Sequence, residues 1–334
     1  RMGRKRKLHL GSTPIGGAAV KSRRLAREIT SKYHVIQNEK ALVEKETDLS
    51  AKAKQQKLSA LDEQMTELGG TNRYQQASII STQHFKTSKW VASTLEKLGR
   101  HNKSRKLNVL EVGAINVQLQ QYNWMDVRAI DLNSQHPQIE EQDFFGVEPQ
   151  RQYDVVVCSM VVNCVNDPIR RGEMLARLSC QLVPESGILF LVLPARCINS
   201  KHVGGVNMMT SLLAGLGLKH VLPVRQTPKL IFFILGNSTE KKKKHATEST
   251  EECDTTQSQE VETISSAGKT TTSSKTVTNV NTPEVVFNWK LHVRAQLAST
   301  LKAGTLKHFT QDFSEVPPNE FAIQLSEDLL DTGM

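Results

Sequence analysis

Two short apolar runs lie within residues 107–132, separated by a stretch long enough for one helix. The first run, LNVLEV, ends immediately before Gly113, and the second, VRAIDL, contains Asp131 near its end. Apolar runs that are bounded by glycine and joined by a crossover predict a strand, a helix and a second, parallel strand. Such a unit begins an α/β sheet of the nucleotide-binding type, whose ligand lies beyond the carboxyl ends of the strands.

Gly113 and Asp131 are the two residues of this unit with a predicted binding role. Gly113 lies where the backbone turns tightly and lets a ligand approach, which a Cβ atom would obstruct. Asp131 follows eighteen residues later, where a carboxylate accepts both hydroxyl protons of a ribose. The alternative is an ordinary βαβ unit in which the glycine and the acid occur by chance.

Composition divides the chain into five predicted parts. They are a basic disordered arm (1–38), an N-terminal helical region (39–106), an α/β core (107–236), a disordered insertion (237–284) and a C-terminal strand region that completes the sheet (285–334). The insertion has no aromatic residue, and nineteen of its forty-eight positions are Ser or Thr. Such a segment buries too little apolar surface to offset its ordering entropy.

Further apolar runs predict the rest of the sheet. YDVVVCS (153–159) and GILFLVLPA (187–195) are continuous enough to be buried parallel strands. KHVLPVRQ (219–226) and KLIFFIL (229–235) favour an antiparallel hairpin, while NEFAIQL (319–325) alternates like a final strand. These three segments compete for the last two positions of the sheet. The pattern predicts a Rossmann-like, seven-stranded α/β sheet of S-adenosylmethionine-dependent methyltransferases, preceded by N-terminal helices.

A dinucleotide-dependent dehydrogenase is the competing interpretation of such a sheet. After the first strand the chain has Gly113-Ala114-Ile115-Asn116 and lacks the GxGxxG pattern that close approach to a pyrophosphate requires. S-adenosylmethionine has no phosphate, so one glycine is sufficient. We therefore expect S-adenosylmethionine as the cofactor.

Other candidate site residues follow the later strands. Asp143 follows the third-strand region, where methyltransferases commonly hydrogen-bond the adenine amino group, and Phe144 beside it is placed to cover the adenine face. The alternative is a loop acid near a core aromatic residue. Asn163 and Arg196 are expected on the substrate side, with a helix-start role and a phosphate contact as their respective alternatives. The five cysteines include no CxxC pair, which favours reduced core thiols and no metal site.

The basic residues are concentrated at the start of the chain. Residues 1–34 contain ten Lys or Arg and one acid, an excess equal to the net charge of +9 of the whole sequence. A basic arm on a neutral body predicts an acidic partner, most often nucleic acid. The RKRK run at 4–7 is typical of a nuclear import sequence. The sequence has no run of eighteen apolar residues, so it predicts no membrane-spanning helix.

Several motifs together resemble the fungal 25S rRNA (adenine-N(1))-methyltransferase family, whose animal relatives act as S-adenosylmethionine sensors. The resemblance covers roughly residues 1–34 and 69–236, with a weaker similarity at NEFAIQL (319–325). The motifs are GGTNRYQQASIISTQ, SKWV, NVLEVGAIN, VRAIDLNS, QDFF and YDVVVCSMVVNCV, followed by RGEML. The resemblance implies cofactor binding at Gly113 and Asp131. It departs around residues 83–88, where relatives tend to have more glycine, and in the long Ser/Thr insertion.

The expected reaction is methylation of adenine N(1) in large-subunit rRNA of the pre-ribosome. The segment Cys158 to Asn163 lacks the Asn/Asp-Pro-Pro-aromatic motif of enzymes that methylate exocyclic amines, and no cysteine follows a proline as pyrimidine carbon-5 methylation commonly requires. The sequence identifies no catalytic residue. We expect a monomer in the nucleus and nucleolus. A cofactor-sensing module without methyl transfer and a protein methyltransferase are the alternatives.

Overall fold

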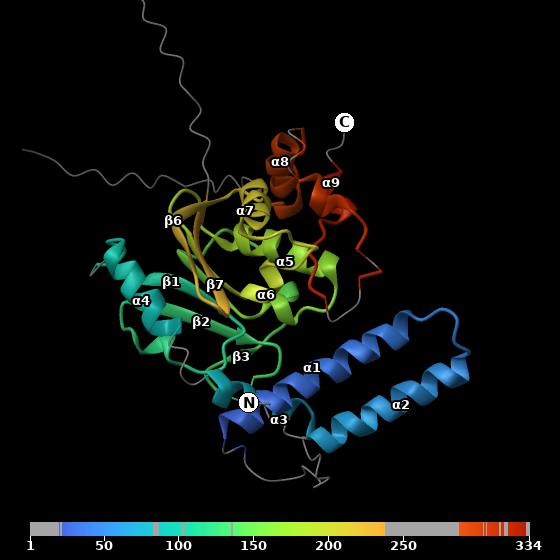
Figure 1. The fold of residues 1–334 in the computed structure, drawn as a ribbon. Helices are drawn as coiled ribbons and strands as arrows, with labels where there is room; N and C mark the ends of the chain where they lie inside the picture. The colour runs from blue at the N-terminus through green and yellow to red at the C-terminus, as the bar shows by residue number, and fades with distance from the viewer. Residues whose placement is uncertain are drawn as a thin grey trace, which may run out of the picture. The chain divides into compact units, whose positions relative to one another are not determined.

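A seven-stranded sheet forms the centre of the structure (Figure 1). In spatial order its strands are β3 (Glu140–Glu141), β2 (Met125–Asp131), β1 (Leu107–Val112), β4 (Val155–Ser159), β5 (Ile188–Pro194), β7 (Leu230–Asn237) and β6 (Leu218–Gln226). The computed structural model describes residues 20, 22–82, 87–101, 104–134, 136–237, 287–302, 304, 306–313, 315–316 and 320–331.

Strand direction and order define where a ligand fits. The strands from β3 to β5 run parallel, whereas β7 is antiparallel to both β5 and β6. From β1 the chain first adds β2 and β3 on one side, and then crosses to add β4 and β5 on the other. In open α/β sheets, ligands bind outside the carboxyl ends of the strands where this order reverses. The ends of β1 and β4 therefore mark the expected site.

Helices cover both faces of the sheet, because its central strands are apolar on both sides. On one face, α4 (Thr87–Lys97) and the short helix η1 (Leu119–Gln121) pack on alternate residues such as Val109 and Phe190. On the other face, the core includes residues of α5 (Pro168–Gln181), α6 (Ala195–Ile198), α7 (Val206–Gly215) and α8 (Trp289–Lys302). The short segments η2 (Phe144–Gly146), η3 (Val162–Cys164), η4 (Lys307–Thr310) and α9 (Glu327–Leu330) complete the described elements.

The N-terminal helices have a small core of their own. It joins α1 (Arg23–Lys45), α2 (Ala51–Leu68) and α3 (Gly70–Thr82), and includes Ile29, Ile36, Leu61 and Ala77. Ser50 accepts a hydrogen bond from Ala53 N at the start of α2, and Gly69 ends that helix in the left-handed conformation. Figure 1 shows α1 and α2 as an antiparallel pair.

The predicted disordered arm is too long at its C-terminal end. The helix α1 already begins at Arg23, and Ser22 Oγ accepts a hydrogen bond from Leu25 N at 3.2 Å. Ala26, Ile29 and Ile36 are buried, so this stretch does carry a helical apolar face. The prediction of disorder is therefore wrong for residues 22–38, whereas residues 1–19 lie outside the described part.

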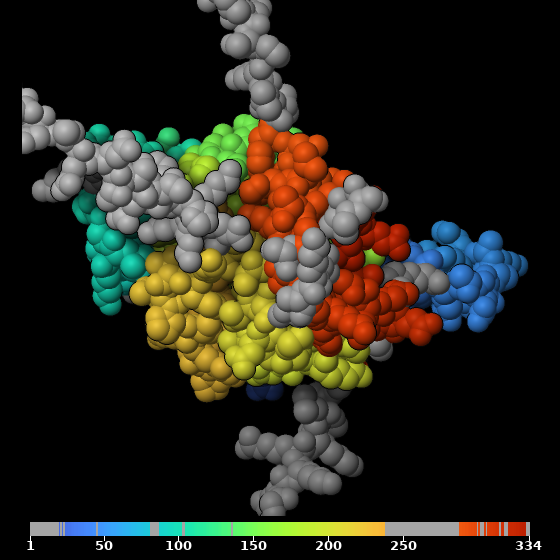
Figure 2. Space-filling model, turned by 90° about the horizontal axis from the view of Figure 1, so that it is seen from above, coloured from blue at the N-terminus to red at the C-terminus, as the bar shows by residue number. Residues whose placement is uncertain are grey.

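The predicted C-terminal strand region is also wrong. Over its whole length β5 pairs with β7, and β6 occupies the outer position, so KLIFFIL and KHVLPVRQ fill the last two places. Residues 320–325 instead form a segment without regular secondary structure against α5, where Gln324 N donates to Pro168 O at 3.0 Å and Arg171 Nη1 donates to Ala322 O at 2.7 Å. Figure 2 shows the C-terminal segments (orange to red) beside the yellow surface that includes α7.

Three further features of the structure concern the predicted insertion, the start of α5 and membrane-spanning helices. Only Asn237 of the predicted insertion belongs to the described residues, and it is the last residue of β7. The insertion from position 238 onward lies outside the described residues. The helix α5 begins at a capped position, where Asp167 accepts a hydrogen bond from Arg170 N and Pro168 lies in the first turn. Across the described segments, no helix combines the length and apolarity needed to cross a membrane.

Candidate active site

Gly113 and Asp131 lie side by side at the carboxyl edge of the sheet. The registers of β1 and β2 pair Val112 with Ile130, and each of the two site residues is the next residue along its strand. Gly113 N and Ala114 N both donate to Ile130 O, at 2.9 and 3.0 Å. The predicted pair is thus brought together by backbone pairing that is independent of either side chain.

Gly113 is required at its position for two reasons. Its φ of +72° lies in the left-handed region, which side chains rarely adopt. In addition, a Cβ atom there would lie 2.3 Å from Cγ2 of Val161, in the segment that follows β4. The absence of a side chain therefore lets the ends of β1 and β4 approach each other closely.

Asp131 is half-buried and held by two donors. Its Oδ1 atom accepts from Asn133 N at 2.9 Å and from Gln75 Nε2 at 3.0 Å. Burial raises the pKa of the Asp131 carboxyl, and these two hydrogen bonds oppose the rise. Gln75 comes from α3 and is only 8% exposed, so the N-terminal helices contact the site directly.

Glu111 is an acidic residue of the site that sequence reasoning missed. It lies in β1, two residues before Gly113, and its Oε2 atom is buried without a hydrogen-bond partner among the described residues. Burial raises the pKa of Glu111 to about 7. A buried, unpaired carboxylate oxygen is costly unless a donor or a cation reaches it.

The two predicted adenine contacts occupy different environments. Asp143 is exposed and accepts a hydrogen bond from Phe145 N at 3.0 Å, at the start of η2. Phe144 is 5% exposed and packs into the core of the sheet, so the predicted cover of the adenine face by its ring is not supported. Phe145 is the more exposed ring, with the Arg170 guanidinium 3.7 Å from its centroid.

Asn163 lies in η3, which begins at Val162 after β4 ends at Ser159. Its Nδ2 atom donates to Cys164 Sγ at 3.4 Å, while its Oδ1 atom is buried without a partner in the described part of the chain. Cys164 Sγ in turn donates to Met160 O at 3.3 Å. Met160 has a φ of +65°, a left-handed conformation that is strained for a residue with a side chain.

Arg196 follows β5 and is exposed. Burial lowers the pKa of His34 in α1, and the nearby positive charge of Arg196 lowers it further. Burial raises the pKa of the Cys197 thiol, and the charge of Arg196 opposes this rise. The structure therefore places Arg196 on the side of the edge that faces α1.

Aromatic side chains from the N-terminal helices meet this edge. Tyr33 of α1 and Tyr74 of α3 stack with their ring centroids 4.1 Å apart, and the Tyr74 hydroxyl lies 3.4 Å from His34 Nε2. Burial raises the pKa of the Tyr74 phenol, and the nearby Cys164 thiol adds to the rise. Residues so far apart in the chain cannot be paired from sequence patterns alone.

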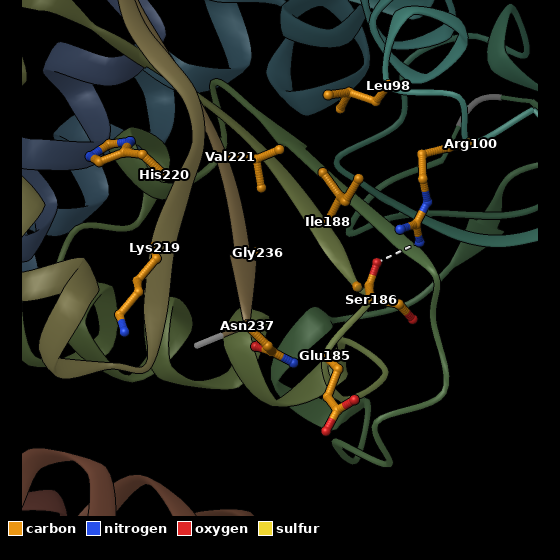
Figure 3. A pocket seen from close by; sticks show the side chains of 11 residues that line it. Leu98, Arg100, Glu185, Ser186, Ile188, Lys219, His220, Val221, Gly236 and Asn237 are labelled. Atoms are coloured by element: carbon orange, nitrogen blue, oxygen red, sulfur yellow. Dashed lines mark hydrogen bonds between the residues drawn. The ribbon is translucent and has the colours of Figure 1, made fainter. Parts of the chain in front are cut away.

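Two cavities lie elsewhere. One, of about 360 Å³, opens at the amino end of β5 and is lined by residues that include Arg100, Glu185, Lys219 and His220 (Figure 3). Arg100 Nη2 donates to Ser186 O there at 2.5 Å. The other, of about 650 Å³, is an apolar groove between α1 and α2 that includes Leu42 and Leu61. Within the described residues, no cluster of His, Cys, Asp or Glu has metal-binding geometry.

A family model described as "25S rRNA (adenine(2142)-N(1))-methyltransferase, Bmt2" matches residues 59–263, more than half of the chain. The chain belongs to this family. Membership confirms the predicted enzyme class, an S-adenosylmethionine-dependent rRNA adenine-N(1)-methyltransferase, and with it the predicted cofactor. The seven-stranded sheet confirms the predicted fold.

Individual relatives agree with the family match. A 25S rRNA adenine-N(1) methyltransferase of Schizosaccharomyces pombe is 26% identical over 228 residues, which cover 63% of this chain and 80% of that protein. The 25S rRNA (adenine(2142)-N(1))-methyltransferase of Saccharomyces cerevisiae is 29% identical over 183 residues, covering 51% of this chain and 52% of that protein. The chain thus spans about half the length of the second relative.

Among solved structures, the magnesium protoporphyrin IX methyltransferase of Synechocystis PCC 6803 with bound SAM is similar to this chain. The TM-score is 0.36 at 16% sequence identity, and the match covers 48% of this chain and 83% of that one.

Proposed function

We propose that the carboxyl edge of β1, β2 and β4 binds S-adenosylmethionine and that the chain transfers its methyl group to N(1) of an adenine in large-subunit rRNA. The observation that carries this proposal is the placement of Gly113 and Asp131 at the carboxyl ends of the adjacent parallel strands β1 and β2, beside the point between β1 and β4 where strand order reverses. A close backbone approach and a carboxylate at the next strand end are what a ribose-bearing ligand requires there.

The chemistry of the surrounding groups fits this cofactor. Asp131 would accept the ribose hydroxyls, and Gly113 would allow close approach. Glu111 would offer its unpaired Oε2 atom to the positively charged amino group of the methionine part. Asp143, exposed after β3, would accept from the adenine amino group. Gln75 already donates to Asp131 Oδ1, so α3 would contribute to the same site.

The reaction needs positioning more than acid–base chemistry. The cofactor supplies a methyl group on a positively charged sulfur. The lone pair of adenine N(1) forms the bond to this carbon while the electron pair of the carbon–sulfur bond stays on sulfur, so no proton moves in the transfer. Alignment alone contributes roughly 7–11 kcal/mol in favourable cases. The residues at the edge therefore act by orienting the two reactants and excluding water.

Adenine N(1) is engaged in every Watson–Crick pair, so the target must be unpaired or turned out of a helix. We propose that the basic N-terminal residues hold the RNA backbone while the base enters the edge near Asn163 and Arg196. The same basic sequence supports work in the nucleus and nucleolus, on the pre-ribosome. We further propose that the chain acts as a monomer.

Methyl transfer can be tested directly. The purified chain is incubated with labelled S-adenosylmethionine and unmodified large-subunit rRNA, and the digested RNA is analysed for 1-methyladenosine by mass spectrometry. We expect label at one adenosine, which the same analysis maps. Tight cofactor binding without RNA methylation would support the sensing module instead, and label on protein would support a protein methyltransferase.

A further inference from the structure

We propose that Asn163 selects the target base by accepting a hydrogen bond from the exocyclic amino group of adenine at its Oδ1 atom. This inference rests on the proposed function, since it names the residue that would recognise the substrate of the same site. Its starting point is the orphaned oxygen of Asn163, which is buried and has no partner among the described residues.

The orientation of the Asn163 amide is fixed by its neighbours. Nδ2 donates to Cys164 Sγ at 3.4 Å, and that sulfur donates to Met160 O at 3.3 Å. With its amino group directed to sulfur, the amide presents its carbonyl oxygen as an acceptor with nothing to accept.

An unpaired buried acceptor is unusual in a folded chain. Leaving such a group without a donor costs about 1–3 kcal/mol, so nearly all are paired. The oxygen is closed off from solvent, so water does not offset the missing bond, and a base reaches it only when neighbouring side chains move aside. The strained backbone of Met160, three residues earlier, is a second cost in the same segment. Costs of this kind concentrate at ligand-binding segments.

The location of Asn163 also fits a base contact. The segment from Met160 to Asn163 follows β4, the strand beside β1, and Val161 fills the space directly over Gly113. A base held here would therefore lie next to the proposed methyl donor. An acceptor at this point matches the amino group of adenine but faces the carbonyl oxygen of guanine, which has no proton to donate. It also leaves the adjacent ring nitrogen, N(1), free to react.

The test exchanges the functional group on both sides of the proposed hydrogen bond. Short RNA hairpins carry either adenosine or purine riboside, which lacks the amino group, at the position mapped in the rRNA. Methyl transfer to both RNAs is measured as kcat/KM for the native chain and for Asn163→Leu, which keeps the side-chain volume without polar atoms. Asn163→Asp retains an acceptor oxygen. Asn123→Ala, an exposed asparagine at the amino end of β2, is the matched control.

We expect the native chain, Asn163→Asp and Asn123→Ala to prefer adenosine. In Asn163→Leu this preference should fall by roughly tenfold to a hundredfold, the loss expected for one hydrogen bond to a buried acceptor, because only transfer to adenosine slows. Comparing ratios cancels the intrinsic difference in reactivity between the two bases. It also cancels any partial unfolding, and Asn163→Ala, compared in the same way, replaces the leucine variant if that one fails to fold.

Two outcomes would overturn the inference. Equal losses with adenosine and purine riboside would assign Asn163 to packing, and unchanged rates with both would remove it from the site. In either case the native chain still forms 1-methyladenosine, so the proposed function would stand. A native chain that methylates no adenosine would overturn the function and the inference together.

Discussion

Two carboxylates of the candidate site, Glu111 and Asp131, differ in how they are paired. Asp131 has two donors on one oxygen, whereas Glu111 has a buried oxygen with no partner among the described residues. The first arrangement holds an acceptor in place for a neutral hydroxyl ligand. The second keeps a carboxyl group whose charge is unfavourable until a donor or a cation reaches it.

Asp131→Ala should abolish tight cofactor binding, because both ribose hydroxyls lose their acceptor. Hydrogen bonds to charged groups contribute about 1.5–3 kcal/mol each, so we expect affinity to fall by on the order of a hundredfold or more. Isothermal titration calorimetry with S-adenosylmethionine measures the change. Asp126→Ala, an exposed acid near the start of the same strand, is the control. Unchanged affinity in Asp131→Ala would place the cofactor elsewhere.

Glu111→Gln should change how stability depends on pH. The pKa of Glu111 in the folded chain is about 7, above its ordinary value of 4.5. Between these values the folded state holds a proton that the unfolded chain has released, so this group lowers the free energy of unfolding as pH rises from about 4.5 to 7. Removing the acid should make the variant more stable than the native chain at pH 8, by about 1–3 kcal/mol.

Urea unfolding at pH 5 and pH 8 measures this difference. Glu141→Gln, which changes an exposed acid in β3, should leave the pH dependence unaltered. If the native chain and Glu111→Gln lose the same stability between the two pH values, the carboxyl of Glu111 is not buried as described.

The sequence predicts part of this site because strand ends are local features. Gly113 and Asp131 each follow an apolar run, and parallel pairing brings such ends together. Gln75 lies 56 residues from Asp131 in the chain, and only tertiary packing of α3 brings the two into contact. Packing likewise decides that Phe144 is buried and Phe145 is more exposed, because two consecutive phenylalanines cannot be distinguished by local sequence.

At the scale of elements, the C-terminal strand region and the start of α1 are predicted incorrectly because local pattern does not determine what a segment packs against. The alternation of NEFAIQL in sequence is not kept in burial, since Phe321, Ala322 and Ile323 are all buried where residues 320–325 pack against α5 instead of joining the sheet. The sequence pattern does not predict the first turns of α1, because the buried residues there, such as Ala26 and Ile29, are few and lie among charged residues. Periodicity predicts conformation, whereas the choice of partner depends on which surfaces are left to cover.

The contact between α5 and the C-terminal segment gives a prediction at this scale. A Cβ atom on Gly172 would lie 2.0 Å from Gln324 O, which is backbone and cannot rotate away. Gly172→Ala should therefore lower the free energy of unfolding by about 1–3 kcal/mol, the usual cost of overpacking. Thermal unfolding monitored by circular dichroism measures it. Helix propensity alone predicts the opposite sign, a gain of about 1 kcal/mol, so increased stability would contradict the packing described here.

At the scale of the whole molecule, the formal charge separates into a basic start and a neutral remainder. Part of that basic start belongs to the folded structure, since Arg24, Arg27 and Lys32 are exposed on α1. Deleting residues 1–34 would therefore cut through a packed helix and confuse loss of charge with loss of fold. Substituting charges that precede α1 avoids this problem.

Replacing Arg4, Lys5, Arg6 and Lys7 by glutamine should weaken RNA binding through the loss of phosphate contacts. Each contact contributes roughly 0.7–0.9 to the slope of log affinity against log salt concentration, so the slope should become shallower by about 3 if all four residues engage phosphates. Fluorescence anisotropy with an rRNA fragment between 50 and 200 mM salt measures the slope.

Replacing Lys241 to Lys244 by glutamine removes the same charge from the predicted insertion and serves as the matched control. Equal changes in both variants would mean that RNA responds only to total charge, whereas an unchanged slope in the first variant would exclude these residues from RNA binding. Affinity for S-adenosylmethionine should stay constant in both, because the proposed cofactor site at the sheet edge includes none of these residues.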